Sequence, residues 1–196
     1  MIDTVPDTVV APGEVARRTI RRSDWVPCKA AFIDCRTPGS DRKDNYSFIG
    51  PGVSQSADQF VNLREPHGFN LGAAGMPRGT TNSLHLHFTA EVFINFGGDY
   101  RLRWGADGRQ GEFVSVDGDV VSVPTWIFRG FTNEGADDGV LLTVLGGDDT
   151  GGIVWGALGA GGGRGSRSTS PPTTGSSTRC RASACPKVSS SSGRCE

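Results

Sequence analysis

The sequence predicts an all-β protein whose antiparallel strands form a sandwich or barrel. From Ala30 onward, short apolar runs alternate with turn signals rich in Gly, Pro, Asn and Asp. After Arg22, the apolar residues do not follow the period of an amphipathic helix. A chain of 196 residues is long enough to bury one core, which predicts a single domain.

The predicted strands follow one another at the short spacing that is typical of sandwiches and barrels. We expect strands at Ala30–Asp34, Tyr46–Phe48, Gln59–Asn62, Gly68–Ala73, Leu84–Phe88, Val92–Phe96, Tyr100–Trp104, Glu112–Val116, Val120–Val123, Ile127–Asn133 and Val140–Leu145. Ahead of them, Glu14–Arg22 fits either a short helix or an extended arm. The expected organisation is therefore an N-terminal arm over residues 1–24 and a β-barrel domain over residues 25–158.

Residues 159–196 differ in composition from the rest of the chain. From Ala160 onward, Val188 is the one branched aliphatic residue, and Leu, Ile, Met, Phe, Trp and Tyr do not occur. Such a segment cannot bury enough apolar surface to offset its ordering entropy, so we predict a disordered tail. Two origins stay open: a native basic tail, or the product of GC-rich coding sequence read out of frame.

Charge and cysteine usage limit the function classes. The tail holds six basic residues and one acidic residue, Glu196, whereas the whole chain carries −1, so residues 1–159 are acidic. An acidic body argues against nucleic-acid binding. We found no long apolar run and no signal peptide, which predicts a soluble, cytoplasmic protein without a membrane partner. The five cysteines match no zinc spacing and are expected to be free thiols.

The most specific motif lies between Gly79 and Gly98, in the stretch GTTNSLHLHFTAEVFINFGG. His85 and His87 stand two apart on a predicted strand, so both side chains point to the same face. Glu91 follows a short turn, and we expect the two strands to form a hairpin. Two imidazoles and one carboxylate form the facial arrangement that non-haem Fe(II) enzymes use. The motif therefore predicts a site for a divalent metal, with Fe(II) favoured and Mn or Zn as further possibilities.

This spacing resembles the first motif of the cupin superfamily: Gly, five residues, His-x-His, three or four residues, Glu, six residues, Gly. The resemblance implies an antiparallel double-stranded β-helix, or jelly-roll, barrel that holds a metal inside and is often a homodimer. Cupins include dioxygenases, decarboxylases, isomerases, lyases, cyclases and metal-free binding proteins, so the resemblance does not give the reaction.

The second cupin motif is present but altered. Gly118 and Pro124 match it, and Asn133 falls at the expected distance. Trp126 stands in place of a glycine, and Arg129 stands where the family places its last histidine ligand. An arginine stays protonated and cannot ligate a metal.

Three alternatives follow from Arg129, which the resemblance to the cupin barrel implies to point inward near Glu91. In the first, His85, His87 and Glu91 bind the metal alone, and Arg129 clamps an anionic group of a small organic substrate. In the second, Arg129 pairs with Glu91 in a metal-free site. In the third, Arg129 turns away and His67, the remaining histidine, completes the ligand shell.

The first alternative gives the leading hypothesis: a metal-dependent, dioxygenase-like oxidoreductase in which Arg129 and Glu91 are catalytic. Phe93 and Asn95 share the face of Glu91 and are expected to line the substrate site, and Asn82 is a further candidate for substrate binding. The alternatives are a metal-dependent lyase, isomerase or cyclase that does not use O₂, and a metal-free cupin that binds a small anion through Arg129.

Overall fold

A computed structural model describes residues 9–156, and the predicted tail lies outside these residues. A short helix and two 3₁₀ turns precede the strands: α1 (Pro12–Arg17), η1 (Arg22–Asp24) and η2 (Ile33–Arg36). The strands are β1 (Asp44–Ile49), β2 (Val61–Leu63), β3 (Phe69–Met76), β4 (Thr81–His87), β5 (Glu91–Phe96), β6 (Tyr100–Trp104), β7 (Gly111–Ser115), β8 (Val120–Val123), β9 (Arg129–Asn133), β10 (Gly139–Gly146) and β11 (Ile153–Trp155).

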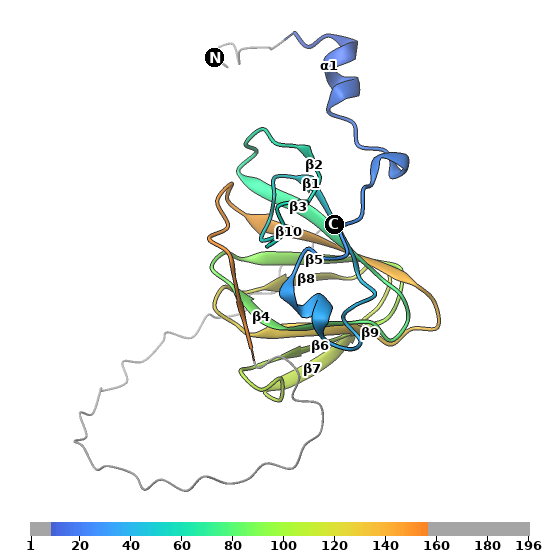
Figure 1. The fold of residues 1–196 in the computed structure, drawn as a ribbon, viewed down its shortest axis with the longest axis vertical. Coiled ribbons are helices and arrows are strands. Elements are labelled where there is room, and N and C mark those ends of the chain that lie inside the picture. Colours follow the sequence, from blue (N-terminus) through green and yellow to red (C-terminus); the bar gives the residue numbers. More distant parts are fainter. Residues whose placement is uncertain (1–8, 157–196) are drawn as a thin grey trace, which may run out of the picture. The chain divides into compact units, whose positions relative to one another are not determined.

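The strands form two sheets that face each other (Figure 1). One sheet has the order β2-β1-β3-β10-β5-β8, and the other has the order β11-β4-β9-β6-β7. All pairings are antiparallel except that of β1 with β2. This is the all-β jelly-roll architecture that the sequence predicts.

The chain crosses from one sheet to the other at two places, one just before Glu91 and one just before Arg129. Residues 88–90 connect β4 to β5, and residues 124–128 connect β8 to β9, although the two strands of each pair belong to different sheets. The expected hairpin between β4 and β5 is therefore wrong. The crossings place Glu91 opposite the histidines across the barrel interior, while His85 lies beside Arg129 in the register of β4 and β9.

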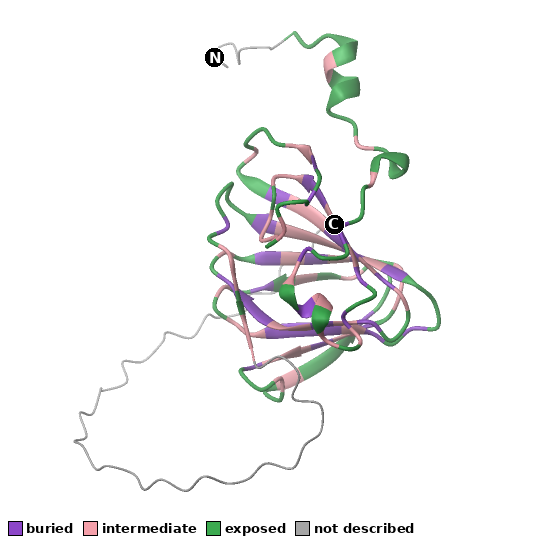
Figure 2. Cartoon of the chain, viewed as in Figure 1, coloured by how far each residue is buried: buried purple, intermediate pink, exposed green. Residues whose placement is uncertain are grey.

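The core lies between the sheets at the end that is formed by the inner faces of β6, β9 and β10 (Figure 2). Its main members are buried apolar side chains, among them Met76, Phe93, Tyr100, Phe131 and Leu141. The rings of Phe93 and Phe131 meet edge to face, with centroids 5.2 Å apart. Alternation along β5 sends Phe93 inward and leaves Phe96 exposed, which is the pattern of a strand with one face on the core.

Some predicted elements differ from the structure. Residues 30–34 form turns and the start of η2 instead of a strand, and Asp34 there is fully buried with its carboxylate on the Lys43 ammonium. Strand β9 begins at Arg129 instead of Ile127, because the crossing occupies the preceding residues. Strand β11, which pairs with β4, was not predicted.

Two further findings concern the class of protein. Within residues 9–156, no helix has the length and apolar character that a bilayer crossing requires. Cys28 and Cys35, the cysteines in the described part of the chain, are free thiols, as expected.

Candidate metal centre

His85 and His87 lie on the inner face of β4, and Glu91 is the first residue of β5. All three are buried, with 3%, 2% and 4% of their surface exposed. One ligand atom from each lies within 4.8 Å of the others. Ligand atoms bind a metal such as zinc at about 2.0–2.2 Å, so small side-chain rotations would bring these three onto one ion. The sequence motif and the structure thus agree on which residues come together.

The surroundings of the two histidines keep both rings neutral. Burial and the nearby Arg129 charge hold the pKa of His85 well below its usual range, and they lower the pKa of His87 to about 3. The His85 Nδ1–H donates to the Ser83 carbonyl at 2.7 Å, and the His87 Nδ1–H donates to the Gly152 carbonyl at 3.4 Å. Each Nε2 therefore keeps a free lone pair, as a metal-ligating imidazole requires.

Arg129 shares the carboxylate of Glu91. Its Nε and Nη2 donate to the same oxygen, Oε2, at 3.1 and 2.5 Å, and Oε2 also lies 3.7 Å from the His87 Nε2. Burial raises the pKa of Glu91, while Arg129 acts in the opposite direction and favours the ionised carboxylate. Because Arg129 is only 2% exposed, this is a buried ion pair, and it has the geometry of the second alternative.

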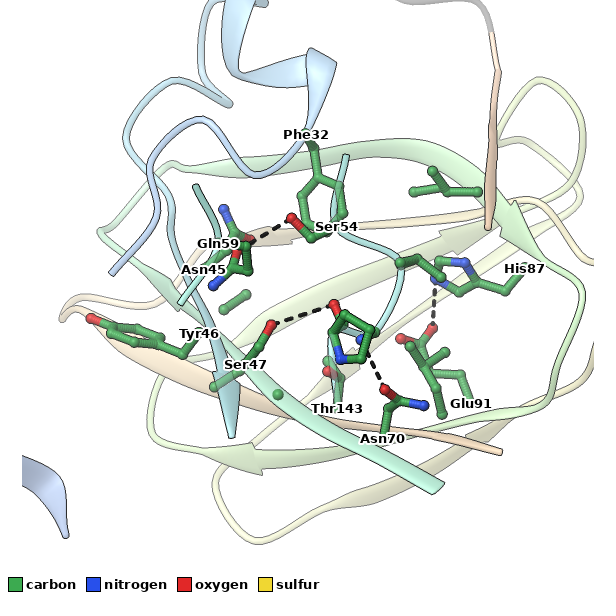
Figure 3. A pocket seen from close by; sticks show the side chains of 18 of the residues that line it. Phe32, Asn45, Tyr46, Ser47, Ser54, Gln59, Asn70, His87, Glu91 and Thr143 are labelled. Atoms are coloured by element: carbon green, nitrogen blue, oxygen red, sulfur yellow. Dashed lines mark hydrogen bonds and ion pairs between the residues drawn. The ribbon is translucent and has the colours of Figure 1, made fainter. Parts of the chain in front are cut away.

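A cavity of about 70 Å³ opens on one side of this ion pair (Figure 3). His85, His87 and Glu91 form part of its wall, and Figure 3 shows His87 pointing toward Glu91. The rest of the wall has both apolar and polar members, and its polar side chains come from β1, β3, β10 and the loop after β1: Asn45, Ser47, Ser54, Gln59, Asn70 and Thr143. Sequence reasoning missed these residues, because Asn and Ser in β-rich sequence read as turn formers.

Asn82 also lines this cavity, and a buried charge fixes its amide. The Lys43 ammonium donates to the Asn82 Oδ1 and to the Asp34 Oδ2. An ammonium can only donate, so the Asn82 Oδ1 accepts from it and the amide NH₂ lies on the side of His85, 3.3 Å from an Nδ1 that already donates to Ser83. The NH₂ therefore keeps its protons for another acceptor. No local sequence signal identifies this network, because its members come from η2, from the residue that precedes β1, and from β4.

The second crossing is strained at Trp126. Its φ is +64°, a left-handed value that no other non-glycine residue adopts within residues 9–156. Its N–H donates to the His87 carbonyl at 3.2 Å, and its ring lies 4.9 Å from that of Phe88 in the other crossing. Since glycine adopts this conformation without cost, the backbone explains why the cupin motif has glycine here.

Three expected placements need correction. Phe93 lies in the apolar core. Asn95 is 1% exposed, and its amide donates to the carbonyls of Gly98 and Ser115. Both residues face inward, but the packing at that depth is closed, and neither lines the cavity beside the histidines. His67 bonds through Nδ1 to the Glu65 carbonyl at 2.6 Å and lies outside the His–His–Glu group, which removes the third alternative.

Comparisons with known proteins support the fold. No family model and no curated protein sequence matches the chain. Among solved structures, the polyketide cyclase RemF from Streptomyces resistomycificus matches with a TM-score of 0.53 and 14% identity, over 72% of this chain and 87% of RemF. The DMSP lyase DddQ from Ruegeria pomeroyi DSS-3 matches with a TM-score of 0.48 and 17% identity, over 67% of this chain and 59% of DddQ. An RmlC-like cupin with a double-stranded β-helix fold from Methanocaldococcus jannaschii matches with a TM-score of 0.38 and 19% identity, over 43% of this chain and 73% of that protein.

The sheet topology and the match to RemF support a double-stranded β-helix fold. This is the fold that the resemblance of the first motif to the cupin superfamily implies. The chain holds a buried His–His–Glu group that could bind a divalent metal. At these identities the likeness extends to the fold alone and leaves the reaction open.

Proposed function

We propose that this protein is a metal-dependent enzyme that acts on a small anionic organic substrate. His85, His87 and Glu91 are the metal ligands, and Arg129 is the anion anchor. The observation that carries the proposal is the arrangement of the two histidines: each is oriented by a backbone carbonyl at Nδ1, and one ligand atom of each lies within 4.8 Å of the other and of Glu91. A buried histidine pair with a structural role alone has no need of two free Nε2 lone pairs beside a carboxylate.

The donor set fits a divalent metal. Two imidazole nitrogens and a carboxylate oxygen suit Fe(II), Mn²⁺ and Zn²⁺, and Fe(II) is favoured for a facial His₂-carboxylate set. When bound, the metal would supply a Lewis acid and, as Fe(II), electrons for reaction with O₂. We propose dioxygenase-like oxidation as the leading chemistry.

The protein's own residues would bind and orient the substrate. The Arg129 guanidinium has five N–H donors, of which Glu91 takes two. The carbonyls of His85 and Ile127 make only long contacts with it, so donors remain for a substrate carboxylate or enolate. The amide NH₂ of Asn82 lines the cavity beside the histidines and could donate to a substrate oxygen there. The burial of the site excludes bulk water, which strengthens both contacts.

Two further candidate functions remain. The fold is shared with RemF, which is a polyketide cyclase, so we also consider metal chemistry without O₂: a lyase, isomerase or cyclase. The Glu91–Arg129 ion pair favours a metal-free binding protein, since Arg129 occupies the oxygen that a metal would use.

The first experiment measures metal content by mass spectrometry on protein that is purified without chelators. We expect roughly one ion per chain, lost in His85→Gln and kept in His67→Gln, which changes the histidine outside the site. If no variant holds metal even after Fe(II), Mn²⁺ or Zn²⁺ is added, the metal-free function replaces the proposal. O₂ uptake by the Fe(II) protein with enol and aromatic acids, against turnover under argon, separates the oxidative chemistry from the non-oxidative alternatives.

We propose a homodimer that forms through the outer face of the β1-containing sheet. Ile94 lies between Leu142 and Val120 in register, and all three point outward. Phe96 and Val120 are 65% and 66% exposed. A continuous apolar sheet face of this kind favours burial against a second copy. Light scattering should give twice the chain mass, and Phe96→Asp should give a monomer. A monomeric wild type would contradict this proposal.

We also propose a cytoplasmic location, because the free thiols Cys28 and Cys35 suit a reducing compartment. Alkylation of both thiols in intact cells would support it, and a disulfide in protein isolated under alkylating conditions would contradict it.

A further inference from the structure

A second cavity lies on the other side of the Glu91–Arg129 ion pair. It has a volume of about 220 Å³ and opens between β6, β7 and β8. Its wall is largely apolar and includes Trp104, Phe113, Val121 and Ile127. Arg129 is part of this wall, whereas Glu91 and the histidines are part of the wall of the first cavity. The two partners of the ion pair thus belong to different cavities, one with the metal ligands in its wall and one with Arg129.

We propose that the apolar cavity binds the hydrophobic body of a single-ring carboxylate, and that the carboxylate pairs with Arg129 and loosens its hold on Glu91. The inference rests on the proposed function for its purpose, because it names the substrate class of the same site. Its binding step stands on the cavity alone and can be measured without metal.

The charge and shape of the cavity select this ligand class. Trp104 and Phe113, with ring centroids 6.3 Å apart, present flat apolar surfaces to the cavity. Its wall holds two cations, the half-buried Arg103 and the buried Arg129, and the Nη1 of Arg129 makes only long contacts of 3.4 Å to the carbonyls of His85 and Ile127. An apolar ring with one carboxylate would satisfy both features. The volume is below the roughly 300–1,000 Å³ of pockets for drug-sized ligands, which favours a single ring.

The Glu91–Arg129 contact is expected to weaken because the ligand carboxylate and Glu91 compete for one guanidinium. Arg129 now holds Glu91 through a single oxygen, Oε2. A ligand carboxylate on Arg129 would share its positive charge and weaken that contact. Glu91 would then be free to approach His87, which is 3.7 Å away. Ligand and metal would therefore bind with positive coupling, and each would tighten the other by the same factor.

The test uses benzoate as the probe and measures its binding to the full-length metal-free chain by calorimetry, with tryptophan fluorescence, to which Trp104 in the cavity wall contributes, as a second signal. We expect saturable binding of benzoate, with at least about tenfold weaker binding of benzamide, which has the same ring but no charge. Acetate, which has the charge but no ring, should also bind weakly. Lack of saturable benzoate binding, or equal binding of benzamide, would overturn the inference.

Variants locate the site. Val121→Phe fills the cavity and should abolish benzoate binding, whereas Val114→Phe, at an exposed position of β7 outside the cavity wall, should leave it unchanged. Phe113→Ser removes a partly exposed wall residue and should weaken binding even if Val121→Phe does not fold. Benzoate affinity that is equal in Phe113→Ser, Val114→Phe and the wild type would overturn the proposed location.

The coupling is measured as the Mn²⁺ and Zn²⁺ affinities with and without saturating benzoate. We expect metal to bind about fivefold more tightly or better with benzoate present. Unchanged metal affinity would overturn the proposal that the ligand carboxylate weakens the contact between Arg129 and Glu91. A chain that binds benzoate but never binds metal would refute the proposed metal-dependent function and leave this cavity assignment standing, so the two failures are distinguishable.

Discussion

The two crossings between the sheets, residues 88–90 and residues 124–128, share a topology and differ in the side chain that each delivers to the barrel interior. The first crossing ends at Glu91, an anion and a candidate ligand. The second ends at Arg129, a cation that pairs with that ligand. They also differ in backbone strain, which lies at Trp126 in the second crossing. One backbone arrangement can therefore place a metal donor or its competitor at the same depth in the barrel.

The largest expected effect comes from breaking the pair that joins the crossings. In metal-free protein, Glu91→Leu should lower the free energy of unfolding by about 3–5 kcal/mol, because it leaves the buried Arg129 without its counter-charge. Denaturant titration measures this. The double variant Glu91→Leu, Arg129→Leu should recover most of the loss, since an apolar pair removes both charges.

The matched control is Glu112→Gln, which weakens a surface pair between Glu112 and Arg101. It should change stability little, because exposed ion pairs are screened by solvent. If Glu91→Leu lowers the free energy of unfolding no more than Glu112→Gln does, the two crossings are not coupled through a buried ion pair.

The next largest effect is expected when the residue at the end of the second crossing is changed to one that can bind a metal. Arg129→His should tighten Zn²⁺ or Mn²⁺ binding by about tenfold or more, since it frees Glu91 and adds an imidazole beside His85. Competition against a chromogenic chelator measures the affinity. Arg129→Leu frees Glu91 without adding a ligand and is the control. Equal affinities for the histidine and leucine variants would mean that position 129 does not face the metal.

A third effect concerns the first crossing and pH. His87 has a pKa of about 3 in the fold against about 6.5 in the unfolded chain, so between these values the unfolded chain binds more protons. Its contribution to stability is therefore complete above about pH 6.5 and falls as the pH drops toward 3, by up to about 1.4 kcal/mol per pH unit.

Unfolding titrations in the presence of a chelator, at several pH values, test this. The stability of His87→Gln should depend less steeply on pH in that window than the stability of the wild type, while His67→Gln should follow the wild type. Parallel curves for His87→Gln and the wild type would show that His87 is not held neutral by the fold.

The sequence predicts the site best where it depends on local spacing. The His-x-His pair needs only the alternation of a strand, and Glu91 needs only a short connection, so both could be placed before the structure. The sheet to which each strand belongs was not predictable from spacing, which is why the expected hairpin was wrong. The polar residues in the wall of the cavity beside the histidines and the Asp34–Lys43–Asn82 network depend on contacts between residues far apart in the chain, and no local pattern encodes them.

The smallest expected effect is at Trp126, where the difference in stability between a glycine and an alanine variant should have the opposite sign to that in a strand. Trp126→Gly and Trp126→Ala both remove the ring that contacts Phe88, but only alanine keeps a Cβ at a φ of +64°. The left-handed conformation costs an L-residue about 1–2 kcal/mol, which glycine avoids. Glycine loses part of this advantage because its unfolded chain has more conformational entropy to give up on folding. The glycine variant should therefore be more stable than the alanine variant, by about 0.5–1 kcal/mol. At Val120, equally exposed but in a strand, glycine should instead be the less stable of the two. If glycine is also the less stable variant at position 126, the second crossing is not strained, and the difference between the crossings reduces to the charge of Arg129.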